Sequence, residues 1–218
     1  MTKALVIGSQ GGIGKALVQA LAERGEVTGL SRADGLDVTD AASVAGVLGA
    51  LSGPFDAVIV ATGALAPPGR QPEKTLRALD PAQMAQQFAV NATGPLLVLQ
   101  HALRLLPRDR RCVFAALSAR VGSIGDNRLG GWYSYRASKA ALNQLIRTAA
   151  VEVARSHPQA VLAAIHPGTV ATRFTEGYPA HRKATPAEAA RNILAVLDAL
   201  SPAQSGGFFD WSGAVVPW

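Results

Sequence analysis

The residues best suited to chemistry are Tyr135 and Lys139, which stand four positions apart in the sequence. If this stretch is helical, both side chains lie on one face, because residues four apart on an α-helix are neighbours. A positive charge beside a phenol favours the phenolate and lowers its pKa from about 10 by roughly one to three units. Tyr135 would then exchange a proton near neutral pH. The alternative is a surface tyrosine beside a solvated lysine, and the rest of the chain decides between them.

The composition indicates one globular domain over residues 1–218 that can bury a sizeable core, since 49% of the residues are apolar. Cys112 is the only cysteine, which rules out an internal disulfide. The apolar run near Met1 is too short for a signal peptide, and no run approaches the roughly 20 residues needed to cross a bilayer. We therefore expect a cytoplasmic protein without a membrane partner.

The net charge of +6 would suit a nucleic acid or an anionic small molecule. The densest basic cluster comprises Arg104, Arg108, Arg110 and Arg111. No aromatic residues for base stacking interleave with it, so we interpret it as a solvated loop and expect no nucleic-acid partner. His166 has no partner at ligand spacing, and no metal site is expected.

A glycine-rich turn joins a buried strand over residues 3–8 to a helical pattern over 15–24. Gly8 suits a tight turn, Gly12 lets the backbone approach a pyrophosphate, and Gly14 lets the helix pack on the strand. The spacing G-x-x-x-G-x-G differs from the common fingerprint G-x-G-x-x-G. Its position between strand and helix still predicts a dinucleotide site.

The second strand, over residues 26–30, ends at Ser31 and Arg32, where a dinucleotide fold meets the adenosine ribose. An arginine there accommodates a 2′-phosphate and favours NADP, although Asp34 nearby leaves NAD possible. No helix fits before Asp37, so this region is an abbreviated strand or an edge loop. Asp37 either lies near the adenine or caps a helix.

Further strands are expected over residues 55–61, 111–117, 160–165 and 206–211, with helices over 81–106, 135–155 and after Thr185. Asn91 lies inside the first of these helices and indicates either a functional distortion or a tolerated polar residue. The alternation of strands and helices predicts a single α/β domain of the doubly wound, Rossmann-like type, with a parallel sheet covered by helices on both faces.

Taken together, these motifs resemble the short-chain dehydrogenase/reductase family over nearly the whole chain. The elements occur in the family's order: the glycine turn, Ala61-Thr62-Gly63-Ala64, Asn91, the Ser118 region, Tyr135 with Lys139, and Pro167-Gly168. The string from Gly122 to Lys139 is most similar to the C-factor and carbonyl-reductase-like subgroup.

The resemblance implies an NADP-preferring oxidoreductase (EC 1.1.1 type) acting on a small carbonyl or alcohol. Tyr135 would be the acid or base, Lys139 would lower its pKa, Asn91 would position a water, and Ser118 would donate to the substrate oxygen. The cofactor-binding residues would be Gly8, Ser9, Gln10, Gly12, Ile13, Gly14, Ser31, Arg32, Asp37, Val38, Thr62, Gly63, Ala64, Asn91, Tyr135, Lys139, Pro167, Gly168, Val170 and Thr172.

One departure from the family pattern concerns the catalytic serine, because its usual position, sixteen residues before the tyrosine, holds Ala119. Either Ser118 takes the role, or Ser123 reaches in, or the donor is missing. The last case allows an alternative function, a nucleotide-binding sensor with little turnover. Residues 173–183 are expected to wall the substrate pocket, and helices 82–106 and 134–155 to form a homodimer or homotetramer.

Overall fold

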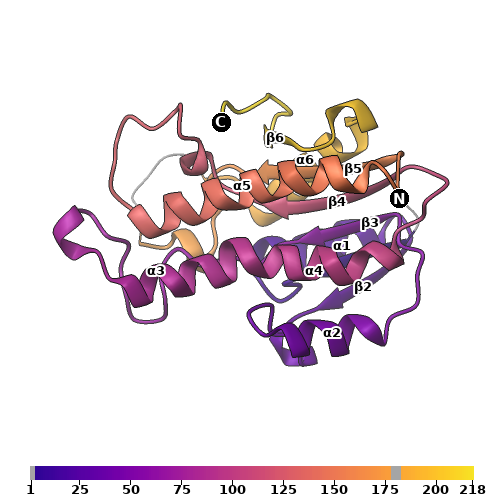
Figure 1. Cartoon of the computed structure of the whole chain (residues 1–218), viewed down its shortest axis with the longest axis horizontal. Helices are drawn as coiled ribbons and strands as arrows, with labels where there is room; N and C mark the ends of the chain where they lie inside the picture. The colour runs from indigo at the N-terminus through magenta and orange to yellow at the C-terminus, as the bar shows by residue number, and fades with distance from the viewer. Residues whose placement is uncertain (1–2, 178–182) are drawn as a thin grey trace.

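The computed structural model describes residues 3–177 and 183–218, and within them six strands form one parallel sheet (Figure 1). The strand order is β2-β1-β3-β4-β5-β6. The strands are β1 (Lys3–Ile7), β2 (Glu26–Leu30), β3 (Ala57–Val60), β4 (Cys112–Leu117), β5 (Ala160–His166) and β6 (Gly207–Asp210). The order reverses between β1 and β3, and the carboxyl ends beside such a reversal are where ligands bind in open α/β sheets.

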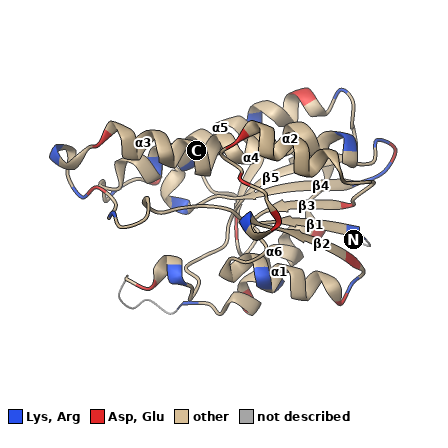
Figure 2. Ribbon diagram, turned by 90° about the horizontal axis from the view of Figure 1, so that it is seen from below, with Lys and Arg blue, Asp and Glu red and all other residues tan. Residues whose placement is uncertain are grey.

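Helices cover both faces of the sheet (Figure 2). On one face lie α1 (Gly12–Ala22) and α6 (Pro186–Ala199), which pack against each other. The other face carries α2 (Ala41–Gly49), α4 (Gly94–Ala102) and α5 (Tyr133–Val153), and α3 (Pro81–Phe88) leads into α4 and lies beside α5. The expectation of a doubly wound α/β domain is confirmed.

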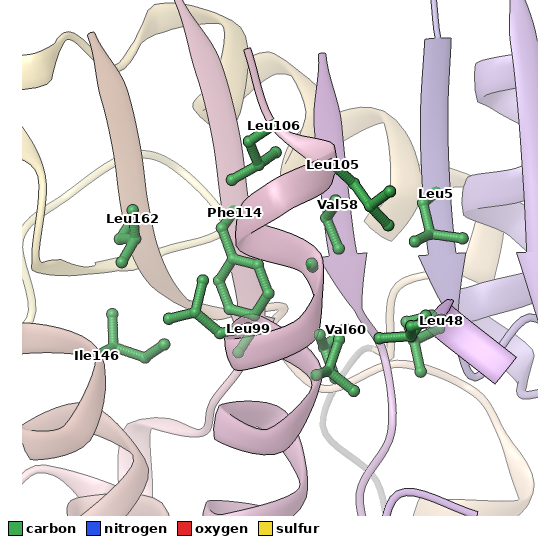
Figure 3. Close-up of a cluster of buried hydrophobic side chains, with 14 of the residues drawn as sticks. Leu5, Leu48, Val58, Val60, Leu99, Leu105, Leu106, Phe114, Ile146 and Leu162 are labelled. Atoms are coloured by element: carbon green, nitrogen blue, oxygen red, sulfur yellow. The ribbon is translucent and has the colours of Figure 1, made fainter. Parts of the chain in front are cut away.

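The core is divided by the sheet because successive strand residues point to opposite faces. Phe114 of β4 is fully buried on the face of α4 and α5, where it packs among Leu99 and Ile146 (Figure 3). The next residue along, Ala115, belongs to the opposite cluster with residues of α1 and α6. The central strands are therefore buried on both faces and hold their carboxyl ends rigidly.

The short connection after β2 is a 3-10 turn, Arg32–Asp34, followed by a loop to α2. Asp37 lies in that loop, so the edge-loop alternative is correct. Asp40 is the N-cap of α2, and its Oδ1 accepts from the backbone N–H of Ala42 at 2.9 Å. No helix other than this 3-10 turn lies between β2 and Asp37, a stretch that the structure describes throughout, and the chain crosses to β3 through α2.

The helix expected over residues 81–106 is interrupted. Asp80 caps α3, but Ala89–Thr93 form a π-helical turn before α4 begins. Asn91 lies in that turn and is completely buried. Such turns are frequent at functional sites, and the local distortion expected at Asn91 is confirmed.

The basic cluster is largely used within the fold, so the expectation of a solvated loop is wrong for two of its members. Arg104 donates to the backbone carbonyls of residues 48, 49 and 51 at the end of α2. Arg111 does the same for the carbonyls of residues 197 and 200 at the end of α6. Both guanidinium groups thus bind carbonyls in the last turn of a helix and just after it, where basic side chains are favourable.

Candidate active site

Tyr135 and Lys139 lie in the first two turns of α5 and are buried, with 6% and 3% of their surfaces exposed. The Lys139 ammonium donates to the carbonyl oxygen of Leu117, the last residue of β4, at 2.7 Å. Burial lowers the pKa of Lys139 to about 7, because desolvation disfavours the charged form. The surface-tyrosine alternative is therefore wrong, and the pair lies at the carboxyl edge of the sheet.

Two aromatic rings flank Tyr135. Trp132 precedes α5 with φ 53°, in the left-handed region, and its ring meets the Tyr135 ring edge-on at a centroid distance of 6.2 Å. The Phe174 ring lies 5.9 Å from the Tyr135 ring. Phe174 belongs to the segment expected to wall the substrate pocket, of which residues 178–182 lie outside the described residues.

Asn91 joins the π-helical turn to the exit of β3. Its Oδ1 accepts from the N–H of Ala64 at 2.9 Å, and its Nδ2 donates to the Ala64 carbonyl at 2.8 Å. Nδ2 also faces Gln87 Oε1 at 2.6 Å and the hydroxyl of Ser138 at 3.1 Å. Ser138 lies between Tyr135 and Lys139 in the sequence, so Asn91 holds the β3 turn, its own helix and α5 together.

Both serine hydroxyls near the end of β4 make hydrogen bonds within the protein. Ser118 is buried, and its O–H donates to Asn143 Oδ1 of α5 at 2.6 Å. Ser123 is also buried, and its hydroxyl oxygen accepts from the N–H of Asp126 at 3.1 Å. Ala119 lies between them with 8% of its surface exposed. The proton of Ser118 is thus already donated within the protein.

The glycine turn packs tightly. Gly8 has φ +85°, which L side chains rarely adopt. A Cβ on Gly14 would lie 2.1 Å from the Gly8 carbonyl oxygen, so only glycine lets α1 start this close to the turn. A Cβ on Gly12 would lie 2.5 Å from Thr172 Cγ2. The turn therefore meets the segment after β5, as the predicted cofactor site requires.

Ser31 and Asp34 form a capping box after β2, in which the N–H and O–H of Ser31 both donate to Asp34 Oδ2, at 2.9 and 2.8 Å. Arg32 between them is exposed. The Asp34 carboxylate is thus occupied by the box. Asp37 accepts from the N–H and O–H of Thr39, and these hydrogen bonds hold the pKa of Asp37 below its usual range.

The exit from β5 begins at His166, whose Nδ1 is buried and has no hydrogen-bond partner among the described residues. Burial lowers the pKa of His166 to about 4, so this imidazole is neutral near pH 7. Gly168 has φ +79°, and Val170 is buried and bridges to Ala184. Farther along this segment, Thr172 lies against Gly12 of the glycine turn.

Three features at this edge fit a dinucleotide. The N-cap of α1 is Gly11, which offers no side-chain acceptor to the first N–H groups of the helix. Thr62 Oγ1 is buried without a partner among the described residues. A Cβ on Gly63 would lie 3.4 Å from Asn91 Oδ1 and 3.5 Å from Lys139 Nζ, so the glycine keeps space open beside both groups.

One feature of the site is not foreseen from sequence. Glu73 lies in the loop after β3 and is buried, with 3% of its surface exposed, and its carboxylate accepts from the N–H and O–H of Ser134. Ser134 immediately precedes Tyr135. A glutamate in a proline-containing loop carries no periodic signal, and its contact is 61 residues away in the chain.

Over residues 3–177 and 183–218, no group of three or more His, Cys, Asp or Glu side chains is placed to hold a metal ion. In the same residues, no helix has the length and apolar character that a bilayer crossing requires.

Comparison with known proteins adds to this geometry. Residues 4–198 match the family model described as enoyl-(acyl carrier protein) reductase. The chain is 39% identical to the C-signal protein of Myxococcus xanthus over 140 residues, which cover 64% of this chain and 81% of that protein. It is 30% identical over the full length of both chains to 1-hydroxy-2-glutathionyl-2-methyl-3-butene dehydrogenase of Rhodococcus sp. strain AD45.

Among solved structures, the NADPH-bound carbonyl reductase from chicken fatty liver superimposes with a TM-score of 0.86 at 25% identity, covering 100% of this chain and 94% of that one. An NADP-bound short-chain dehydrogenase/reductase from Burkholderia multivorans gives 0.80 at 26% identity, covering 100% and 99%. With its parallel sheet, its glycine turn and its buried tyrosine–lysine pair, the chain belongs to the short-chain dehydrogenase/reductase family of oxidoreductases, in the C-factor and carbonyl-reductase-like group.

Proposed function

We propose that this protein is an NADP(H)-dependent carbonyl reductase or alcohol dehydrogenase acting on a small-molecule substrate. The observation that carries the proposal is the burial of Tyr135 one helical turn from Lys139, beside the space that Gly63 keeps open. Family membership and the similarity to an NADPH-bound carbonyl reductase support it.

When bound, the nicotinamide supplies the hydride for a carbonyl carbon, or accepts it from an alcohol. Tyr135 donates its phenolic proton to the carbonyl oxygen during reduction and takes a proton from the alcohol during oxidation. Protonated Lys139 favours the phenolate and so makes Tyr135 a stronger acid. Because the pKa of Lys139 is about 7, this assistance weakens as the pH rises above neutrality.

Two further residues act on this pair through the scaffold. Asn91, bonded to Ala64 and Ser138, holds the π-helical turn against α5, and in our proposal it positions a water that links Lys139 to solvent. Ser118 steadies α5 on β4 through its hydrogen bond to Asn143.

The cofactor would lie along the carboxyl ends of the strands. The glycine turn, with Ser9, Gln10 and Ile13, would bind the pyrophosphate through N–H groups at the start of α1. Asp37 and Val38 would border the adenine. Thr62, Gly63, Ala64, Pro167, Gly168, Val170 and Thr172 would surround the nicotinamide half.

The preference for NADP over NAD rests on Arg32. Its neighbour Asp34 already accepts two hydrogen bonds from Ser31, which leaves this carboxylate less available to a ribose 2′-hydroxyl. The exposed guanidinium of Arg32 is the group suited to a 2′-phosphate.

The proposal is tested by following NADPH and NADH oxidation against a panel of aldehydes, ketones and quinones, together with a titration of nucleotide binding. Turnover with NADPH preferred over NADH is the expected result. Tight nucleotide binding without turnover of any panel member contradicts the reductase and favours the second candidate.

That second candidate is a nucleotide-binding sensor of the same fold. It is favoured by the serine region, since Ala119 stands where the family has its hydroxyl and Ser118 donates to Asn143 instead. A site lacking this donor would bind cofactor and turn over slowly, because one donor of this kind contributes roughly 10² to 10³ in rate.

We also propose a homodimer or homotetramer built on α5 and the helices beside it. Leu145 and Val151 of α5 are 36% and 54% exposed, apolar side chains that a second copy would cover. Sedimentation equilibrium of the wild type and of Val151→Lys tests this, with dissociation expected in the variant.

A further inference from the structure

Glu73 is a buried acid with no part in the proton transfer described above. Its carboxylate accepts from the Ser134 N–H at 3.3 Å and from the Ser134 hydroxyl, and its backbone oxygen accepts from the Trp132 N–H at 2.5 Å. No ion pair in the described residues joins Glu73 to a cation. Burying a carboxylate without a cationic partner costs free energy of folding. The hydrogen bonds that Glu73 makes in return therefore indicate a specific role.

These hydrogen bonds fall on the first turn of α5. The first N–H groups of a helix have no internal acceptor, and Trp132, the N-cap residue, makes no side-chain capping bond. Ser134 is the second residue of the helix, so the Glu73 carboxylate supplies the missing acceptor from a distant loop. A negative charge at this end of a helix is also favourable to its dipole.

The loop that carries Glu73 is itself anchored. Pro72 is buried beside Glu73, and Gln83 Nε2 of α3 donates to the carbonyl of Gln71 at 3.2 Å. The first turn of α5 is also tied to the segment before it, since Arg136 Nε donates to the carbonyl of Gly131 at 3.0 Å. Glu73 therefore holds the first turn of α5 from a supported position.

Tyr135 is the residue directly after Ser134, and the ring of Trp132 packs edge-on against it. Glu73 thus binds Trp132 and Ser134, the residues immediately before and after the first residue of α5. A shift there would move the phenol relative to Lys139 and to the cofactor space.

We propose that Glu73 is a positioning residue that fixes the first turn of α5 and so orients Tyr135 for proton transfer. This inference rests on the proposed function. Misplacement of a reacting group by about 1 Å can cost about 10²-fold in rate, so the effect should appear in kcat.

The test compares wild type with Glu73→Leu, Ser134→Ala, the double variant and the control Glu23→Leu. Leucine keeps roughly the size of the side chain but offers no acceptor to the N–H or the hydroxyl of Ser134. Glu23 is an exposed acid at the end of α1. Each protein is measured for kcat, KM, NADPH affinity, melting temperature and amide hydrogen exchange.

For Glu73→Leu we expect kcat to fall by about tenfold to 10²-fold with NADPH affinity unchanged. Exchange should speed up by about tenfold in residues 131–138 only, the factor that corresponds to one lost hydrogen bond of about 1.4 kcal/mol. Ser134→Ala should act in the same direction, and the double variant should lose less than the product of the two single losses. Glu23→Leu should match wild type.

Unchanged exchange in residues 131–138 of Glu73→Leu overturns the inference, and this readout does not depend on turnover. A uniform rise in exchange over the whole chain with a lower melting temperature also overturns it, because Glu73 would then support the fold in general. If wild type turns over no substrate, the proposed function fails while the exchange result still decides the role of Glu73.

Discussion

Lys139 of α5 donates a hydrogen bond to the carbonyl oxygen of Leu117 at the end of β4, with 2.7 Å between the two atoms. The bond fixes the ammonium at the edge of the sheet where the parallel strands end. The lysine is also buried, and desolvation brings its pKa down to about 7.

This pKa makes stability depend on pH. Between about pH 7 and the ordinary lysine pKa near 10.5, the unfolded chain binds more protons than the folded one, so the free energy of unfolding rises with pH. From about pH 7 to about pH 8.5 the cofactor-free wild type should gain about 1 to 2 kcal/mol relative to Lys139→Met. Urea denaturation of both proteins measures this. Parallel pH dependences would show that Lys139 keeps an ordinary pKa.

Gly14→Ala should destabilise the protein and impair nucleotide binding. The added methyl group would lie 2.1 Å from the backbone oxygen of Gly8, and such overpacking costs about 3 kcal/mol or more. Gly46→Ala is the matched control, since Gly46 lies in α2 with open space around it. Alanine there should raise the free energy of unfolding by at most about 1 kcal/mol. Chemical denaturation of both variants gives the comparison, and equal effects would contradict the tight packing of the turn.

Arg32→Ala should weaken NADPH binding by about tenfold or more and leave NADH binding nearly unchanged, because a hydrogen bond to a charged group contributes about 1.5 to 3 kcal/mol. Fluorescence titration with both nucleotides provides the affinities. Arg191→Ala, which removes an exposed arginine from α6, serves as the control. Equal losses for NADPH and NADH would mean that Arg32 does not read the 2′-phosphate.

Ala119→Ser should raise kcat by about tenfold or more, since it restores a hydroxyl at the position where the family places its donor. Ser118→Ala should instead lower the free energy of unfolding by about 1 to 3 kcal/mol, because Asn143 Oδ1 loses its donor inside the protein. Steady-state kinetics and denaturation separate the two effects. A large fall in kcat for Ser118→Ala with stability intact would return Ser118 to the role of substrate donor.

Much of the fold is legible in the sequence because its signals are local. Apolar strand patterns, Asp80 before Pro81 and Thr185 before Pro186 mark element boundaries that the structure shows within a few residues. The π-helical turn at Asn91 is harder to foresee, since its shape depends on contacts with Ala64 and α5. The same holds for Arg104 and Arg111, whose acceptors are distant helix ends.

In the candidate site, too, the local features follow from the sequence and the long-range contacts do not. The spacing of Tyr135 and Lys139 follows from the helical period alone, whereas their burial depends on the packing of α5 against the sheet. The roles of Glu73 and Trp132 are not predicted by any sequence pattern. One acts through a contact 61 residues away, and the other through a left-handed backbone conformation that its residue type does not favour.

The role of Tyr135 as acid or base is tested by the turnover of Tyr135→Phe beside Tyr133→Phe, with NADPH binding measured for both. Tyr133 is 37% exposed and has Ala137 rather than a lysine four residues later. We expect Tyr135→Phe to bind NADPH like wild type but to lose about 10² to 10⁴ in kcat, the usual contribution of a general acid, while Tyr133→Phe keeps full activity. Wild-type turnover in Tyr135→Phe would show that Tyr135 is not the acid or base.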